Sequence, residues 1–207
     1  MLLFGDYKKQ FGGTTIIHVP SLALEHGIYW LKGENGSGKT TLIRSIAGLI
    51  PYDGRIAVDG CDIRTDRMTY TASVNYAEAE PLYPGFLTGN DLINFYRETK
   101  KGSDQQVGEL TAALGITDYA GNQTGTYSSG MAKKLSLVLG FMGAPKLILL
   151  DEPLITLDQR SVQVLQGLIQ QYYMAGVSFL ITSHQELTFD NIAPIRLQLK
   201  DKTLSRA

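Results

Sequence analysis

A glycine-rich loop that runs into a lysine is the first feature of the sequence that could do chemistry. Gly33, Gly38, Lys39 and Thr40 form the pattern Gly-x-x-x-x-Gly-Lys-Thr, and Gly36 is a third glycine within it. Glycine lets the backbone turn sharply and approach a ligand closely, and successive N–H groups of such a loop can surround a phosphate. The lysine can reach the β- and γ-phosphates of a nucleotide, and the threonine hydroxyl can bind Mg²⁺. The pattern therefore predicts a nucleoside triphosphate site.

A pair of carboxylates, Asp151 and Glu152, ends the apolar run "LILLDEP". Ligands of open α/β sheets bind at the carboxyl ends of the strands. We expect Asp151 to hold Mg²⁺ through water and Glu152 to orient or deprotonate an attacking water, which suits hydrolysis. The alternative is a strand that simply ends in a polar turn, since Asp-Glu-Pro stops strands well. The glycine-rich loop earlier in the chain favours the catalytic interpretation.

The elements that must position these residues alternate between strands and helices. Short β-rich runs at 16–19 and 27–32 precede the loop, and apolar residues at steps of three and four predict a helix directly after it. "KLILLDEP" and "VSFLITSH" are continuous apolar strands, typical of a parallel sheet that is covered on both faces. The layout is therefore α/β. We expect a further strand at 54–59, a solvated turn at Lys8–Lys9, and helices at 91–96, 105–114, 129–142 and 160–174.

Composition excludes several other classes of protein. The chain has 207 residues, of which 43% are hydrophobic, and 19 basic side chains against 20 acidic ones give a net charge of −1. Nucleic-acid binders usually carry a basic excess, so we expect no nucleic-acid partner. The single cysteine, Cys61, excludes an internal disulfide and a CxxC metal site. No apolar run approaches the roughly 20 residues of a membrane-spanning helix, so a role at a membrane requires another chain.

On these residues the sequence resembles the ATP-binding subunits of ABC transporters, from about Leu2 to about Leu199. "GENGSGKTTLIRSIAGLIPYDGRIAVDGCDI" resembles the first third of that family, and "LILLDEPLITLD" resembles its Walker B strand and D-loop. "YSSGM" lies at the signature motif and "LITSH" at the switch histidine. The resemblance implies an α/β P-loop NTPase with a RecA-like parallel-sheet core, an N-terminal antiparallel β subdomain and an inserted helical subdomain. It implies one ABC ATPase domain over 1–207, divided into a core (1–80 and 144–207) and a helical subdomain (81–143).

The resemblance also implies a role for individual residues. ATP and Mg²⁺ are the expected cofactors, with Thr40 and Asp151 at the metal and Lys39, Glu152 and His184 in catalysis. Phe11, 22 residues before Gly33, lies where an aromatic ring stacks on adenine, with Tyr7 as the competing candidate. The nucleotide-binding residues implied in this way are Phe11, Gly33, Asn35, Gly36, Ser37, Gly38, Lys39, Thr40, Thr41, Ser128, Gly130 and Asp158.

Three departures from the family pattern stand out. Ser129 replaces a glycine of the signature and Met131 replaces its glutamine. The Q-loop, within "VNYAEAEPLYPGFLT", contains no glutamine, and its position falls on Glu78, Ala79 or Glu80 depending on the alignment. A carboxylate could still bind Mg²⁺ whereas an alanine could not, and we favour Glu78 as the metal ligand.

The partners that the resemblance implies are membrane permease subunits and a second ATPase subunit, in a homodimer or a heterodimer. Two subunits would sandwich two ATP molecules head to tail, so that Ser128 and Gly130 contact the γ-phosphate of the opposite site. The chain would then lie on the cytoplasmic face of the cell membrane as a peripheral subunit. A soluble ATPase of the same superfamily, not linked to transport, is the alternative. A non-catalytic partner in an asymmetric heterodimer is a third, against which Lys39, Asp151, Glu152 and His184 argue.

Overall fold

The computed structural model describes residues 1–185, 188–189 and 192–206, and two sheets dominate it. An antiparallel sheet has the strand order β2-β1-β4-β5, and a six-stranded sheet has the order β10-β9-β3-β8-β7-β6. In the larger sheet β9, β3, β8, β7 and β6 run parallel to one another, and β10 pairs antiparallel with β9. The strands are β1 (Leu2–Phe11), β2 (Thr14–Leu24), β3 (Ile28–Lys32), β4 (Asp53–Val58), β5 (Cys61–Asp62), β6 (Val74–Ala77), β7 (Leu147–Asp151), β8 (Ser178–Thr182), β9 (Ile195–Lys200) and β10 (Thr203–Arg206).

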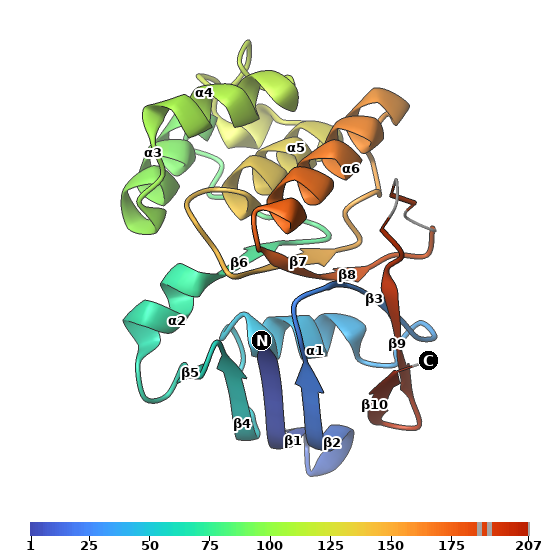
Figure 1. Ribbon diagram of the computed structural model, residues 1–207. Coiled ribbons are helices and arrows are strands. Elements are labelled where there is room, and N and C mark those ends of the chain that lie inside the picture. Colours follow the sequence, from blue (N-terminus) through green and yellow to red (C-terminus); the bar gives the residue numbers. More distant parts are fainter. Residues whose placement is uncertain (186–187, 190–191, 207) are drawn as a thin grey trace.

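Helices cover the six-stranded sheet in two layers (Figure 1). On one face lie α3, α4, α5 and α6, and on the other α1 lies between this sheet and the antiparallel one. A 3₁₀ helix at Thr124–Thr126 precedes α5. The α-helices are α1 (Lys39–Ile46), α2 (Arg67–Ser73), α3 (Gly89–Lys100), α4 (Asp104–Ala113), α5 (Ser129–Gly140) and α6 (Gln159–Met174).

Two hydrophobic cores correspond to these layers. One contains the inner sides of α3 to α6 with one face of the sheet, and the other joins α1 and the antiparallel sheet to the opposite face. Every residue of β7 and β8 is buried, because both faces of these central strands are covered. Their carboxyl ends, at Asp151 and Thr182, are therefore held in a rigid frame.

Strand β1 is the element that is hardest to predict from the sequence. Its buried residues alternate through Leu2 and Phe4, then shift register at a bulge, where Asp6 has φ 47°, and resume at Tyr7 and Lys9. The expected turn at Lys8–Lys9 is therefore wrong. Lys9 is only 6% exposed, and its Nζ donates to the carbonyl of Pro51 at 2.6 Å, which satisfies the buried ammonium.

The fold class that the resemblance implied is confirmed, including the parallel-sheet core and the antiparallel sheet. The division at 80 and 144 stays a prediction, although α3, α4 and α5 do form a contiguous layer (Figure 1). No helix among the described residues is long and apolar enough to cross a bilayer.

Candidate active site

One pocket of about 490 Å³ contains most of the residues that the sequence singled out. It opens at the carboxyl ends of β3, β7 and β8, which is where ligands bind in α/β sheets. Its lining combines the glycine-rich loop, the start of α1, the two carboxylates and an aromatic ring. The lining residues are Phe11, Ile16, Asn35, Gly36, Gly38, Lys39, Thr40, Thr41, Asp151, Glu152 and His184.

The loop contains three positions that only a glycine can occupy without strain or a clash. Gly36 has φ +79° and Gly38, the N-cap of α1, has φ +104°, both in the left-handed region. At Gly33 a Cβ atom would come within 2.9 Å of the Leu199 carbonyl oxygen on β9, so this position also excludes a side chain. Lys39 Nζ donates to the carbonyls of Gly33 at 2.8 Å and Glu34 at 3.1 Å, which holds its ammonium across the loop.

Ser37, like Gly33, belongs to the expected loop set but does not line the main pocket. It lines an adjoining hollow of about 350 Å³ with residues of β9 and the turn after it. Its Oγ is buried without a hydrogen-bond partner among the described residues. An unsatisfied hydroxyl in this loop suits an additional acceptor such as a phosphate oxygen.

The two carboxylates are oriented by a threonine that the sequence analysis did not select. Thr182, fully buried at the end of β8, donates from Oγ1 to Asp151 Oδ1 at 2.7 Å. The same Oγ1 accepts from the Glu152 N–H at 2.9 Å. Glu152 itself has φ 44°, a left-handed conformation that costs free energy outside glycine and clusters at functional sites. The turn that points Glu152 into the pocket therefore depends on Thr182.

His184 faces Glu152 across the pocket. Its backbone N–H donates to Glu152 Oε2 at 3.4 Å, and its ring Nε2 lies 3.5 Å from Glu152 Oε1. The imidazole is 60% exposed whereas the carboxylate is 15% exposed. The histidine can therefore reach a ligand in the pocket without leaving the carboxylate.

The choice between Phe11 and Tyr7 follows from burial. Phe11 is 54% exposed at the rim of the pocket, and the ammonium of Lys9 lies 4.5 Å from its ring centroid. Tyr7 is fully buried, donates to Ser45 Oγ at 2.8 Å, and burial raises its pKa to about 12. Only the phenylalanine ring is available to stack on a base.

The signature segment and the D-loop aspartate lie outside this pocket. Ser128 is the N-cap of α5, where its Oγ accepts from the Met131 N–H at 3.2 Å. Gly130 packs closely on the segment after β7, since a Cβ atom there would come within 3.1 Å of the Thr156 carbonyl oxygen. Asp158 caps α6 and pairs with Lys134 of α5 at 2.8 Å, and this hydrogen bond is the main reason why its pKa is well below its usual range.

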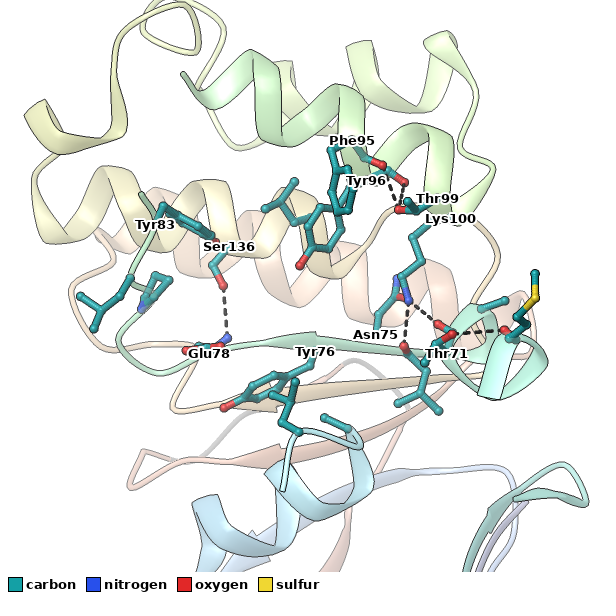
Figure 2. A pocket seen from close by; sticks show the side chains of 18 residues that line it. Thr71, Asn75, Tyr76, Glu78, Tyr83, Phe95, Tyr96, Thr99, Lys100 and Ser136 are labelled. Carbon is teal, nitrogen blue, oxygen red and sulfur yellow. Dashed lines mark hydrogen bonds between the residues drawn. The ribbon is translucent and has the colours of Figure 1, made fainter. Parts of the chain in front are cut away.

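Glu78 lines a separate groove instead of the pocket that contains Asp151 and Glu152 (Figure 2). Its backbone N–H donates to Ser136 Oγ of α5 at 3.2 Å. Tyr76 lies between this groove and the pocket that contains Asp151. Its OH is 3.5 Å from Asp151 Oδ2, and its side chain is hydrogen-bonded to Arg44 of α1. The hydrogen bond between Tyr76 and Arg44 is the largest contribution to the raised pKa of Arg44. The metal role of Glu78 stays a prediction.

This groove, of about 410 Å³, lies between α2, β6, α3 and α5 (Figure 2). Large apolar side chains border it although they are far from buried: Leu49 is 57% exposed, Met68 84%, Leu82 92% and Phe95 61%. Behind them Lys100 of α3 donates to the carbonyls of Thr71 and Val74, which ties α3 to the end of α2. Exposed apolar patches of this kind mark interaction surfaces.

The oxygen ligands in the pocket with Asp151 and Glu152 suit Mg²⁺. No cluster of three or more histidine, cysteine, aspartate or glutamate side chains that could hold a metal exists among the described residues. Mg²⁺ does not need one, because in nucleotide sites it is bound by one or two protein oxygens together with substrate phosphates and water. The Asp151 carboxylate and the Thr40 hydroxyl line the same pocket and are hard oxygen ligands of that type.

Comparisons with known sequences show which proteins this chain is similar to. A family model described as ABC transporter matches residues 18–155. The linearmycin resistance ATP-binding protein LnrL of Bacillus subtilis (strain 168) is 30% identical over 89% of this chain, which spans only 61% of that relative's length. The cytochrome c biogenesis ATP-binding export protein CcmA of Legionella pneumophila (strain Lens) is 33% identical, over 82% of this chain and 83% of its own.

A solved structure also matches the fold. It is a dimeric ATP-binding cassette in a post-hydrolysis state with ADP and Pi, with a TM-score of 0.82 at 17% identity. The match covers 100% of this chain and 97% of that one.

Proposed function

Because the chain belongs to the ABC transporter family of ATP-binding proteins, we propose that it binds and hydrolyses ATP as the subunit that powers a transporter. The observation that carries the proposal is the single pocket in which the glycine-rich loop meets Asp151, Glu152 and His184. The loop alone would suit many nucleotide-binding proteins. A carboxylate held beside it in a strained turn suits hydrolysis.

ATP binding rests on the loop and on Phe11. The loop N–H groups and the N-terminus of α1 bind the phosphates, and Lys39 moves its ammonium from the loop carbonyls to the β- and γ-phosphates. Adenine stacks on the exposed ring of Phe11. Thr40 and Asp151 would hold Mg²⁺, which neutralises phosphate charge when it is bound. Asn35, Ser37 and Thr41 add contacts to the same phosphates.

Hydrolysis depends on Glu152 and His184. Glu152 accepts a hydrogen bond from a water molecule and aligns it with the γ-phosphorus, taking its proton as the P–O bond to ADP breaks. The His184 imidazole, 3.5 Å from that carboxylate, contacts the γ-phosphate and the same water. ADP and inorganic phosphate are the products. The hydrogen bonds from Thr182 to Asp151 and from the Glu152 N–H to Thr182 keep both carboxylates in position.

A second subunit completes each site. Ser128 and Gly130 begin α5 outside the pocket, so their contact with a γ-phosphate needs another copy or a related chain arranged head to tail. Ser129, which replaces a signature glycine, lies at the exposed start of that helix. Glu152→Gln should bind ATP without turning it over and accumulate as an ATP-bound dimer. Light scattering at high protein concentration that shows only monomer, with ATP binding measured in parallel, would count against this arrangement.

The groove of Figure 2 is the docking site that we propose for a permease. An apolar helix on the cytoplasmic side of a membrane subunit would cover Leu49, Met68, Leu82 and Phe95, which would hold this chain on the inner face of the membrane. Co-purification of a multi-span chain from native membranes supports this assignment. Recovery with soluble assembly, translation or repair factors would support the soluble alternative.

ATP binding by Lys39→Ala tests the proposal at its first step. Titration calorimetry should show that this variant loses most of the affinity, because a charge-assisted contact to phosphate disappears. Lys32→Ala is the matched control, since Lys32 lies just before the loop but its ammonium rests 3.9 Å from the Trp30 ring. Equal affinity for ATP in the parent and Lys39→Ala would refute the assignment.

A further inference from the structure

Lys133 is a fully buried lysine in the middle of α5. Its ammonium donates to three main-chain carbonyls, those of Glu78 at 2.7 Å, Ala79 at 3.1 Å and Asp151 at 3.0 Å. An ammonium has three N–H donors, so every one of them is used. A buried charge is costly unless its hydrogen bonds are complete, and this one is retained by carbonyl dipoles.

The three carbonyls belong to segments with different roles. Asp151 ends β7 in the nucleotide pocket, whereas Glu78 and Ala79 follow β6 at the position of the missing Q-loop glutamine. Glu78 also lines the groove of Figure 2. One side chain therefore joins the floor of the groove to the strand that carries the catalytic carboxylates.

A second contact from the same helix strengthens the joint. Ser136 lies three residues after Lys133, on the same face of α5, and its Oγ accepts from the Glu78 N–H at 3.2 Å. Both backbone polar groups of Glu78 are thus bonded to side chains of α5. A displacement of this helix, whose first turn carries Ser128 and Gly130, must carry the loop at 78–79 with it.

We propose that Lys133 is a positioning residue for ATP hydrolysis, which keeps Asp151 and Glu152 in register with the loop at 78–79 and so couples the groove to the catalytic carboxylates. The inference rests on the proposed ATPase activity. Lys133 is not one of the residues that line the nucleotide pocket. It acts through the backbone of Asp151, one residue before the strained turn at Glu152.

The chain offers a matched control. Lys100 is also a lysine whose ammonium bonds to carbonyls, those of Thr71 and Val74, and burial lowers the pKa of both lysines to about 8. The two carbonyls that accept from Lys100 lie at the end of α2 and the start of β6, away from the nucleotide pocket. A substitution at Lys100 therefore reproduces the loss of a partly buried, carbonyl-bonded ammonium without touching the segment at Asp151.

The test compares Lys133→Met, Lys133→Gln and Lys100→Met with the parent at pH 7.0, below the pKa of both lysines. It measures kcat and KM for ATP hydrolysis, the ATP dissociation constant by calorimetry, and the thermal midpoint. Lys133→Met should lower kcat on the order of 10²-fold, because small misplacements of catalytic groups have effects of that size. ATP affinity should change by no more than about twofold. Glutamine, which keeps two N–H donors, should restore part of kcat.

Lys100→Met should keep the parent's kcat at a temperature where it is folded. Equal kcat in Lys133→Met and the parent, or a fall no larger than in Lys100→Met, would overturn the proposal. If Lys133→Met does not fold, Lys133→Gln and Lys100→Gln decide the question in the same way. A parent that binds ATP but does not hydrolyse it would instead refute the proposed function, so the two failures are distinguishable.

Discussion

Thr182→Val removes one hydroxyl at the point where both carboxylates are held. The valine keeps the shape of the fully buried side chain, but the 2.7 Å hydrogen bond to Asp151 Oδ1 is lost. A hydrogen bond to a charged group contributes about 1.5–3 kcal/mol to stability. The Glu152 N–H still donates to the Thr182 carbonyl at 3.1 Å, so the loss of its hydrogen bond to the Thr182 hydroxyl costs less free energy. We expect a destabilisation of about 2 kcal/mol, which in a domain of this size lowers the thermal midpoint by about 4–8 °C.

The catalytic effect should be larger than the effect on binding. Without the hydrogen bond at Oδ1, Asp151 keeps the longer contact of Oδ2 with the Tyr76 OH and is less firmly oriented. The value of kcat should therefore fall by at least about tenfold while ATP affinity stays close to that of the parent. Thr111→Val is the control, because Thr111 is also buried but donates only to backbone carbonyls of its own helix, that of Val107 at 2.8 Å. Thermal unfolding and steady-state phosphate release measure both quantities. Equal values for Thr182→Val and Thr111→Val would refute the role assigned to this hydroxyl.

Two further predictions concern pH and metal. Burial lowers the pKa of Lys100 from its ordinary 10.5 to about 8, so between these values the unfolded chain binds more protons and the free energy of unfolding rises with pH. Denaturant unfolding between pH 8 and 10 should show a smaller rise for Lys100→Met than for the parent, because Lys133, whose pKa burial also lowers to about 8, still contributes in the variant. Identical slopes would contradict this expectation. If Glu78 binds the metal, the ATPase rate of the parent should depend more steeply on Mg²⁺ than that of Glu78→Gln. Superimposable Mg²⁺ titrations would leave Glu78 with a role in the groove alone.

The parts of the site that the sequence predicts are those made by neighbours in the chain. The loop at 33–40 needs its glycines for a local conformation, and Asp151 and Glu152 end a strand whose unbroken apolar run requires burial on both faces. Thr182 and Lys133 act across 31 and 18 residues of sequence, respectively, on Asp151. Nothing in their local sequence distinguishes them from an ordinary strand threonine and helix lysine.

The same distinction explains the misread elements of the fold. Strand β1 escaped prediction because a bulge at Asp6 breaks its alternation, and because Lys9 becomes buried only when the Pro51 carbonyl meets it. Strand β6 has four residues and no pattern of its own, and it is stabilised by pairing with β7. Phe11 and Tyr7 are both aromatic residues of one strand. Only the burial of Tyr7 against Ser45, visible in the structure, shows that Tyr7 cannot be the ring that stacks on a base.

Phosphate release from ATP by Glu152→Gln, compared with the parent at saturating ATP and Mg²⁺, tests the central claim most directly. Glutamine preserves the size of the side chain and can still approach the water, but it cannot accept the water's proton. We expect ATP affinity close to that of the parent and a hydrolysis rate lower by about 10²–10⁴-fold, the usual contribution of a general base. Hydrolysis at the parent's rate by Glu152→Gln would contradict the claim.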